Sequence, residues 1–149
     1  MANTQAMCTS FKQDLLNGVH AFSSAYRAVD TFKAALYTAA SSLGAATTSY
    51  TTATTEVSGT NYTAGGVTVT NATAPTTSGT TAYWTPSASF TYSNVTLTTA
   101  FDAVLVYNST ATGKNAVSVH TFGSQTITAG TFILTMPTND ATNALIRIA

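Results

Sequence analysis

The sequence predicts a mainly β protein, an antiparallel β-sandwich of jelly-roll-like type with one α-helix near the N-terminus. Thr fills 33 of the 149 positions, and Thr and aromatic residues favour the pleated surface of a sheet. Short apolar runs with a period of two recur after residue 29, separated by Gly, Asn and Ser. Many short strands with such punctuation are typical of sandwiches and barrels. Only the N-terminal region carries a helical pattern.

The predicted helix covers residues 9–22. Thr9 or Ser10 can cap its first turn, and apolar side chains then recur at helical spacing. Gly18 weakens the last turn, so we expect the helix to end near His20. Because most polar side chains fall off the apolar stripe, the helix is expected to lie against a sheet or a neighbouring subunit. The stripe consists of Phe11, Leu15, Leu16, Val19 and Phe22.

The first predicted strand is residues 31–38, in which Phe32, Ala34 and Leu36 share one face. Later segments repeat the two-residue period, and Gly or Asn between them predicts turns. So many segments are more than one flat sheet accommodates, which favours two packed sheets. The further predicted strands are 67–70, 80–84, 89–92, 95–98, 103–107, 116–122, 125–128, 131–136 and 145–148.

Length and composition predict a single domain, residues 1–149, because a chain of this size can bury one sizeable core. Residues 1–28 form an N-terminal helical arm with only two Thr, and residues 29–149 form the Thr-rich β-sandwich. Segment 43–66 is predicted to be a long ordered loop with Glu56 as its only charged residue. Long loops in compact domains usually serve a function, so we expect this one to contact a partner.

The charges exclude several classes of partner. Five Lys and Arg balance five Asp and Glu, the formal net charge is zero, and only 7% of residues are charged. The cations are scattered, so we expect no binding to nucleic acid and none to a membrane surface. No run approaches the roughly 20 apolar residues of a membrane span. The single Cys8 is expected to be a small buried side chain, since it has no partner for an internal disulfide.

Residues for acid–base chemistry are sparse. The only histidines are His20 and His120, and the chain has no G-x-S-x-G, H-E-x-x-H or P-loop motif. The five carboxylates are spread along the chain, and no pair of them is suggested by spacing. We therefore interpret both histidines as hydrogen-bonded structural residues in preference to metal ligands. The sequence predicts no enzymatic activity, no cofactor and no metal site.

Trp84 supports one alternative function. It is the only Trp and lies beside a predicted strand end, where an exposed indole would offer a stacking platform for a sugar. A lone Trp in such a place is more often part of the core. Carbohydrate binding therefore stays an alternative, with Trp84 as its test.

Strings along most of the chain match one family pattern. They are SFK (10–12), LL (15–16), DTFKAALY (30–37), YTAGG (62–66), VYN (106–108), NAVSV (115–119), FG (122–123), GTF (130–132) and LIRIA (145–149). Together they resemble a family of small virion proteins of tailed bacteriophages. The matching strings are structural and mark no active site.

The resemblance implies a virion structural protein made in the cytoplasm of a bacterial host. A β-sandwich with an apolar helix, and without fibre-like repeats or coiled-coil heptads, favours a capsid decoration (cement) protein, with a tail, head–tail connector or fibre-associated protein as the alternative. The expected partners are the major capsid protein or other virion proteins, and we expect a homo-oligomer. The residues expected to contact partners are Phe11, Leu15, Leu16, Val19, Phe22, Tyr50 and Tyr62.

Overall fold

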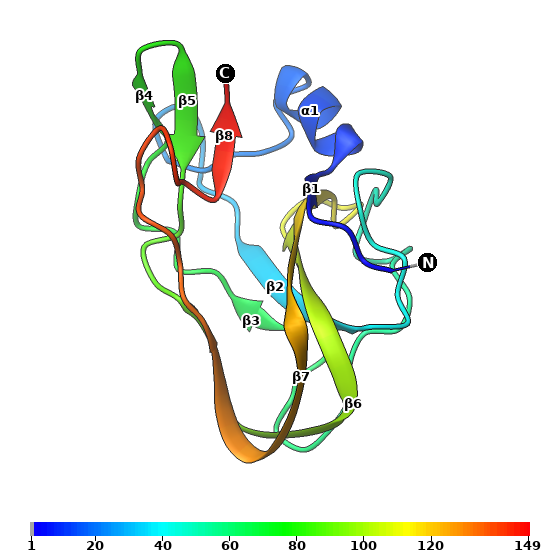
Figure 1. The fold of residues 1–149 in the computed structure, drawn as a ribbon. Coiled ribbons are helices and arrows are strands. Elements are labelled where there is room, and N and C mark those ends of the chain that lie inside the picture. Colours follow the sequence, from blue (N-terminus) through cyan, green and yellow to red (C-terminus); the bar gives the residue numbers. More distant parts are fainter. Residues whose placement is uncertain (1) are drawn as a thin grey trace.

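The structure, a computed structural model, describes residues 2–149 and contains two antiparallel sheets in a β-sandwich (Figure 1). The five-stranded sheet has the order β1-β7-β6-β2-β3, and the three-stranded sheet has the order β4-β5-β8. Strands make up 43% of the chain and helix 5%, so the predicted fold class is confirmed. The elements are β1 (Ala6–Met7), α1 (Thr9–Leu16), β2 (Phe32–Thr38), β3 (Val67–Thr68), β4 (Thr76–Ser78), β5 (Thr81–Trp84), β6 (Phe90–Asn108), β7 (Ala116–Leu134) and β8 (Ile146–Ile148).

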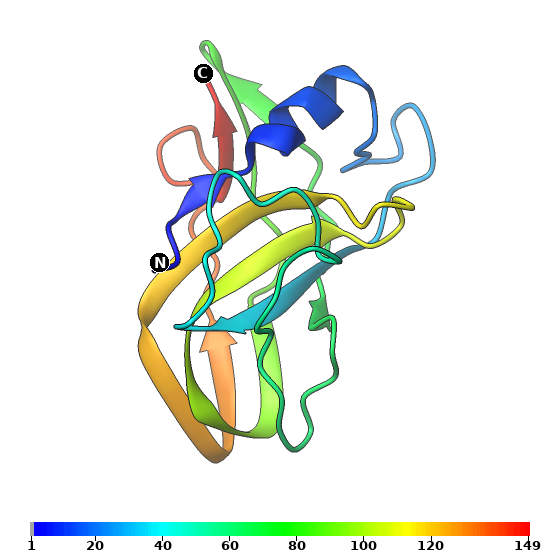
Figure 2. The ribbon, with the colours of Figure 1, turned by 90° about the vertical axis from the view of Figure 1, so that its right-hand side faces the viewer.

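One long hairpin dominates the strand order. β6 and β7 are each 19 residues long and pair from Tyr107↔Ala116 to Phe90↔Leu134. Three separate strands were predicted in each of these regions, and that prediction is wrong. The predicted breaks are places where the register shifts, and there Asn94 and Ala129 adopt positive φ angles of 52° and 46°. Such bulges let two strands bend together without ending, as Figure 2 shows at the lower end of the hairpin.

The core lies around β2, the strand between β6 and β3. Phe32 of β2 is fully buried and stacks on Phe22 with 4.5 Å between ring centroids, while Phe22 lies 4.7 Å from the ring of Trp84 in β5. These rings connect the two sheets. Trp84 is only 2% exposed, and its indole N–H donates to Asn71 and to the Thr73 carbonyl. It therefore presents no free face to a sugar, and the carbohydrate-binding alternative loses its platform.

The helix is shorter than predicted. α1 ends at Leu16, and the Asn17 N–H still donates to the Gln13 carbonyl before Gly18 takes a φ of +68°. A left-handed residue just after the last turn is a common helix ending, and Gly adopts it without steric cost. The expected end near His20 is therefore wrong. Beyond Gly18 the chain is irregular but still brings Phe22 into the core.

The N-terminal region is part of the core and does not form a separate arm. β1 pairs with β7 through Ala6↔Val119 and Met7↔Ser118. Cys8, fully buried as predicted, and Phe11, 1% exposed, belong to the same hydrophobic cluster as the β-strands. Removal of the segment from β1 to Phe22 would therefore take away an edge strand and part of the core.

Segment 43–66 is irregular, as predicted, and is fixed to the body at separate points. Single bridges join Glu56 to Tyr37, Ser49 to Asn115 and Thr60 to Thr96. It lies over the same sheet as β2 and β6 (Figure 2). Within residues 2–149, no helix has the length and apolar character needed to cross a membrane.

Candidate interaction surface

The structure divides the residues expected to contact partners into two groups. Phe11 is buried and Phe22 is half-buried against the core, with an edge-to-face contact of 6.0 Å between their rings. Leu15 and Val19 are half-buried, whereas Leu16 is 91% exposed at the end of α1. Leu16 and its neighbour Leu15 are thus available for partner contact, and Phe11 is not.

Tyr50 and Tyr62 bind a carboxylate of their own loop. The Tyr62 hydroxyl donates to Glu56 Oε1 at 2.7 Å and the Tyr50 hydroxyl to Oε2 at 2.8 Å, while the Gly65 amide also donates to Oε1 at 2.7 Å. The Tyr62 oxygen in turn accepts from the Leu36 amide of β2. Burial and the nearby Glu56 charge raise the pKa of both phenols. This cluster anchors the loop to the sheet, a role that differs from the expected partner contact.

A second buried network surrounds Asp30, which is 4% exposed. Its carboxylate accepts from the Ala21 amide at 2.7 Å, from both terminal nitrogens of Arg27 at 2.8 and 3.0 Å, and from Asn108 at 2.8 Å. Burial raises the pKa of Asp30, but these donors outweigh it and hold the pKa below its ordinary value. The network fixes the irregular segment after α1 to the end of β6.

His20 extends this network toward α1. Its Nδ1 lies 3.1 Å from Asn108 Nδ2, and its Nε2 lies 3.6 Å from Asp14 Oδ2. An amide nitrogen donates, so Nδ1 accepts and Nε2 carries the proton. Burial lowers the pKa of His20 against the opposing effect of Asp14. The predicted hydrogen-bonded structural histidine agrees with this geometry.

A groove of about 650 Å³ lies between α1 and β8. Leu16 and Ile148, which is 44% exposed, line it. β8 is the last strand of its sheet, so its outer edge pairs with no strand among residues 2–149. Both α1 and β8 lie at the same end of the molecule in Figure 1. The other lining residues are Met7, Lys12, Leu15, Arg147 and Ala149.

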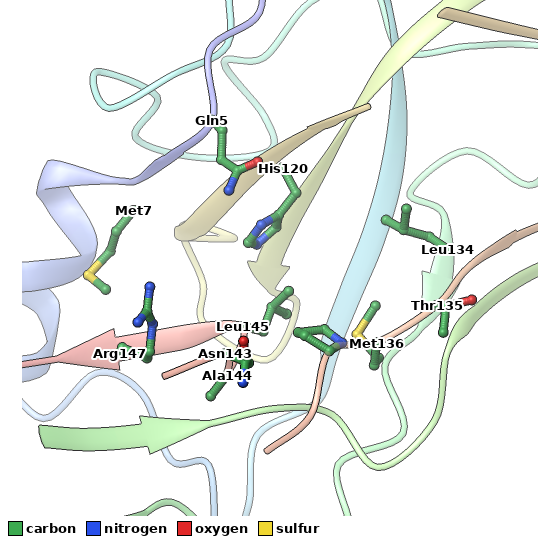
Figure 3. A pocket seen from close by; sticks show the side chains of 11 residues that line it. Gln5, Met7, His120, Leu134, Thr135, Met136, Asn143, Ala144, Leu145 and Arg147 are labelled. Atoms are coloured by element: carbon green, nitrogen blue, oxygen red, sulfur yellow. The ribbon is translucent and has the colours of Figure 1, made fainter. Parts of the chain in front are cut away.

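A second pocket, of about 450 Å³, adjoins this groove because Met7 and Arg147 line both. In Figure 3, Arg147 of β8 and Gln5 point toward the space beside His120 of β7. Leu134 and Met136 form the opposite, apolar wall. The two hollows therefore follow one seam, bordered by the edge strands β1 and β8 of the two sheets.

Lys12 and Arg147 are exposed cations that form no ion pair within residues 2–149, although the charge of Arg147 contributes to lowering the pKa of Asp140. Across residues 2–149, Arg27 is the one Lys or Arg that forms an ion pair. Every carboxylate, in contrast, already accepts hydrogen bonds within the chain. Asp14 accepts from Asn115, Asp30 from Arg27, Glu56 from two tyrosines, Asp102 from Asn3, and Asp140 from Asn143. The formal balance of charge thus leaves unpaired positive charge along the seam.

His120 is hydrogen-bonded but is not part of a catalytic arrangement. Its Nε2 lies 2.8 Å from Ser118 Oγ, yet Ser118 is only 1% exposed and no carboxylate within the described chain bonds to the imidazole. A nucleophile needs access to substrate and a base oriented by a third group. In the described part of the chain, no three His, Cys, Asp or Glu side chains gather in a metal-binding arrangement.

His120 predicts a pH dependence of stability. Burial lowers its pKa from 6.5 to about 4. Between these pH values the unfolded chain binds a proton at His120 that the folded protein does not bind. Stability should therefore fall as pH drops from 6.5 toward 4, with a slope of up to about 1.4 kcal/mol per pH unit from this group. Urea unfolding at several pH values gives the free energy of unfolding as a function of pH, and this dependence should be shallower for His120→Gln than for wild type. Parallel curves for the two proteins would contradict this assignment.

Comparison with protein-family models, with curated proteins and with solved structures found no match to this chain. The features of this chain that bear on its function are therefore the seam, its exposed apolar side chains and its unpaired cations.

Proposed function

We propose that the protein is a structural component of a tailed-bacteriophage virion, acting as a decoration protein on the head. The observation that supports this proposal most strongly is the exposed apolar end of α1, where Leu16 is 91% exposed next to the half-exposed Ile148. Exposed apolar side chains gathered around a groove are typical of protein–protein contact sites. The sequence resemblance to small virion proteins supports the same function.

The construction of the body fits this proposal. Its hydrogen-bond networks around the buried Asp30 and the half-buried Glu56 fix irregular segments to the sheets, which gives a rigid platform. Few charges would need desolvation when such a surface packs against a neighbour, and desolvation of ions is costly. In this proposal the protein is localised on the virion, its partner is the major capsid protein or another virion protein, and it forms homo-oligomers on the particle.

Purified particles test the proposal. Quantitative mass spectrometry should find the protein in virions that have been banded in a density gradient and washed in high salt. A decoration protein approaches the copy number of the capsid subunit, whereas a tail or connector component is present in few copies. Absence from washed particles would overturn the virion proposal.

A further inference from the structure

We infer that the seam between α1 and β8 binds an extended acidic segment of a partner protein, which adds as a strand to the free edge of β8. This inference rests on the proposed function, since it specifies the chemistry of the virion partner. Three independent features of the seam support it: an unpaired strand edge, two unpaired cations and exposed apolar side chains.

The free edge supplies the backbone interactions. β8 pairs with β5 on one side, through Ala82↔Ile148 and Trp84↔Ile146, and ends the sheet on the other. An exposed edge presents unpaired N–H and C=O groups to any extended chain of suitable shape. The adjoining groove of about 650 Å³ provides room within the usual range of ligand sites. Recognition by strand addition uses such an edge for affinity and nearby pockets for side-chain specificity.

The cations select acidic side chains. Lys12 and Arg147 border the groove from α1 and from β8, and neither forms an ion pair in the described chain. A carboxylate on the inserted segment would pair with Arg147, whose planar guanidinium binds carboxylates through two hydrogen bonds. Leu16 and Ile148 would be covered by an apolar side chain of the same segment. An apolar side chain between acidic ones therefore fits both features.

The same charges argue against two other occupants. A second copy of this chain could offer only carboxylates that already accept hydrogen bonds within their own chain, so pairing with Arg147 would compete with those bonds. A nucleic-acid backbone would satisfy Lys12 and Arg147 but would leave Leu16 and Ile148 uncovered. The partner that fits is a different protein with an exposed extended segment.

A peptide experiment tests the seam with the full chain in isolation. The probe is a seven-residue peptide of alternating valine and aspartate, and its matched control carries asparagine in place of aspartate. We expect the acidic peptide to shift the amide NMR signals of β8 and to slow their hydrogen exchange, with about tenfold weaker binding of the control. A version with alternate amides N-methylated should not bind, because it cannot pair as a strand.

Three outcomes would overturn the inference. They are equal binding of the asparagine peptide, equal binding of the N-methylated peptide, and preferential binding of a single-stranded oligonucleotide. None of them depends on whether the protein is found in virions.

A particle experiment links the seam to the proposed function. Arg147→Glu should lower occupancy on particles about tenfold, while Lys114→Glu, with the same charge change outside the groove, should leave it unchanged. Both variants should keep the wild-type unfolding midpoint. Equal occupancy of Arg147→Glu and wild type would overturn the seam inference and leave the virion function standing. Absence of wild type from particles would overturn the function, and the peptide result would still decide the seam.

Discussion

Replacement of Gly66 by alanine is expected to destabilise the fold strongly. Gly66 has a φ of +73°, and a Cβ at this position would lie 1.8 Å from the backbone oxygen of Ala34 and 2.6 Å from the Ala35 Cα. These are backbone atoms of the buried strand β2, so no side chain can rotate away to make room. The Ala34 oxygen also accepts a hydrogen bond from the buried Tyr92 hydroxyl at 2.8 Å. A shift of this backbone would therefore disturb both the β2–β3 pairing and the core.

The matched control is Gly79→Ala. Gly79 has a similar φ of +57°, but a Cβ there would meet no atom within 4 Å. The free energy of unfolding of the control should fall only by the cost of a left-handed alanine, about 1–2 kcal/mol. For Gly66→Ala it should fall by more than about 3 kcal/mol. Urea unfolding monitored by fluorescence of the buried Trp84 measures both variants. Equal stabilities would show that loop 43–66 does not approach β2 as closely as the structure places it.

The second large effect is expected for Asp30→Asn. The new amide nitrogen would face donors from Ala21, Arg27 and Asn108, which now all point at the carboxylate. Removal of one partner of a buried charged network leaves the other groups unpaired, and a loss of about 2–4 kcal/mol is expected. Chemical unfolding measures this loss. Asp140→Asn is the matched control, because the Asp140 carboxylate is solvated and serves its own turn. A larger effect at position 140 than at position 30 would contradict the network's importance.

The stabilisation that Asp30 provides should depend on pH in a definite direction. The folded pKa of Asp30 is lower than its ordinary value of 3.8, so its stabilisation is present at neutral pH. That stabilisation is lost as pH falls through the folded pKa. The contribution of the Asp30 carboxylate to the stability difference between wild type and Asp30→Asn should therefore shrink only in strong acid, as pH falls through the folded pKa. This window lies below the one expected for His120, so the two effects can be separated.

The fold class could be predicted from the sequence because its signal is local. The two-residue period in Phe32, Ala34 and Leu36 marks β2 correctly, and α1 begins at Thr9. The predicted cap by Thr9 or Ser10 is wrong, because the N-cap residue is Cys8 and no side chain caps the helix. The same local signal misplaced the breaks in β6 and β7. Asn94 and Ala129 adopt turn-like φ angles, yet pairing continues past them. A single sequence cannot distinguish a turn from a bulge, because both use the same residues.

The candidate surface was predicted only in part, for a different physical reason. The apolar stripe of the helix contains Leu15 and Leu16, whose contact with a partner stays a prediction, but the period alone could not show that Phe11 faces the core and Leu16 faces solvent. Tyr50 and Tyr62 were assigned to a partner because their acceptor, Glu56, gives no sign in the sequence of binding them. The Asp30–Asn108 bond spans 78 residues. Such hydrogen-bond partners are set by the tertiary fold, and no sequence motif indicates them.

The copy number of this protein in washed virions tests the central claim most directly. Mass spectrometry with isotope-labelled peptides from this chain and from the major capsid protein gives the ratio of the two. Our account predicts a ratio near one, as expected for a decoration protein that covers the head. A ratio far below one, equivalent to a few copies per particle, would contradict the decoration proposal and favour a tail or connector position. Absence from the particle would contradict the virion function altogether.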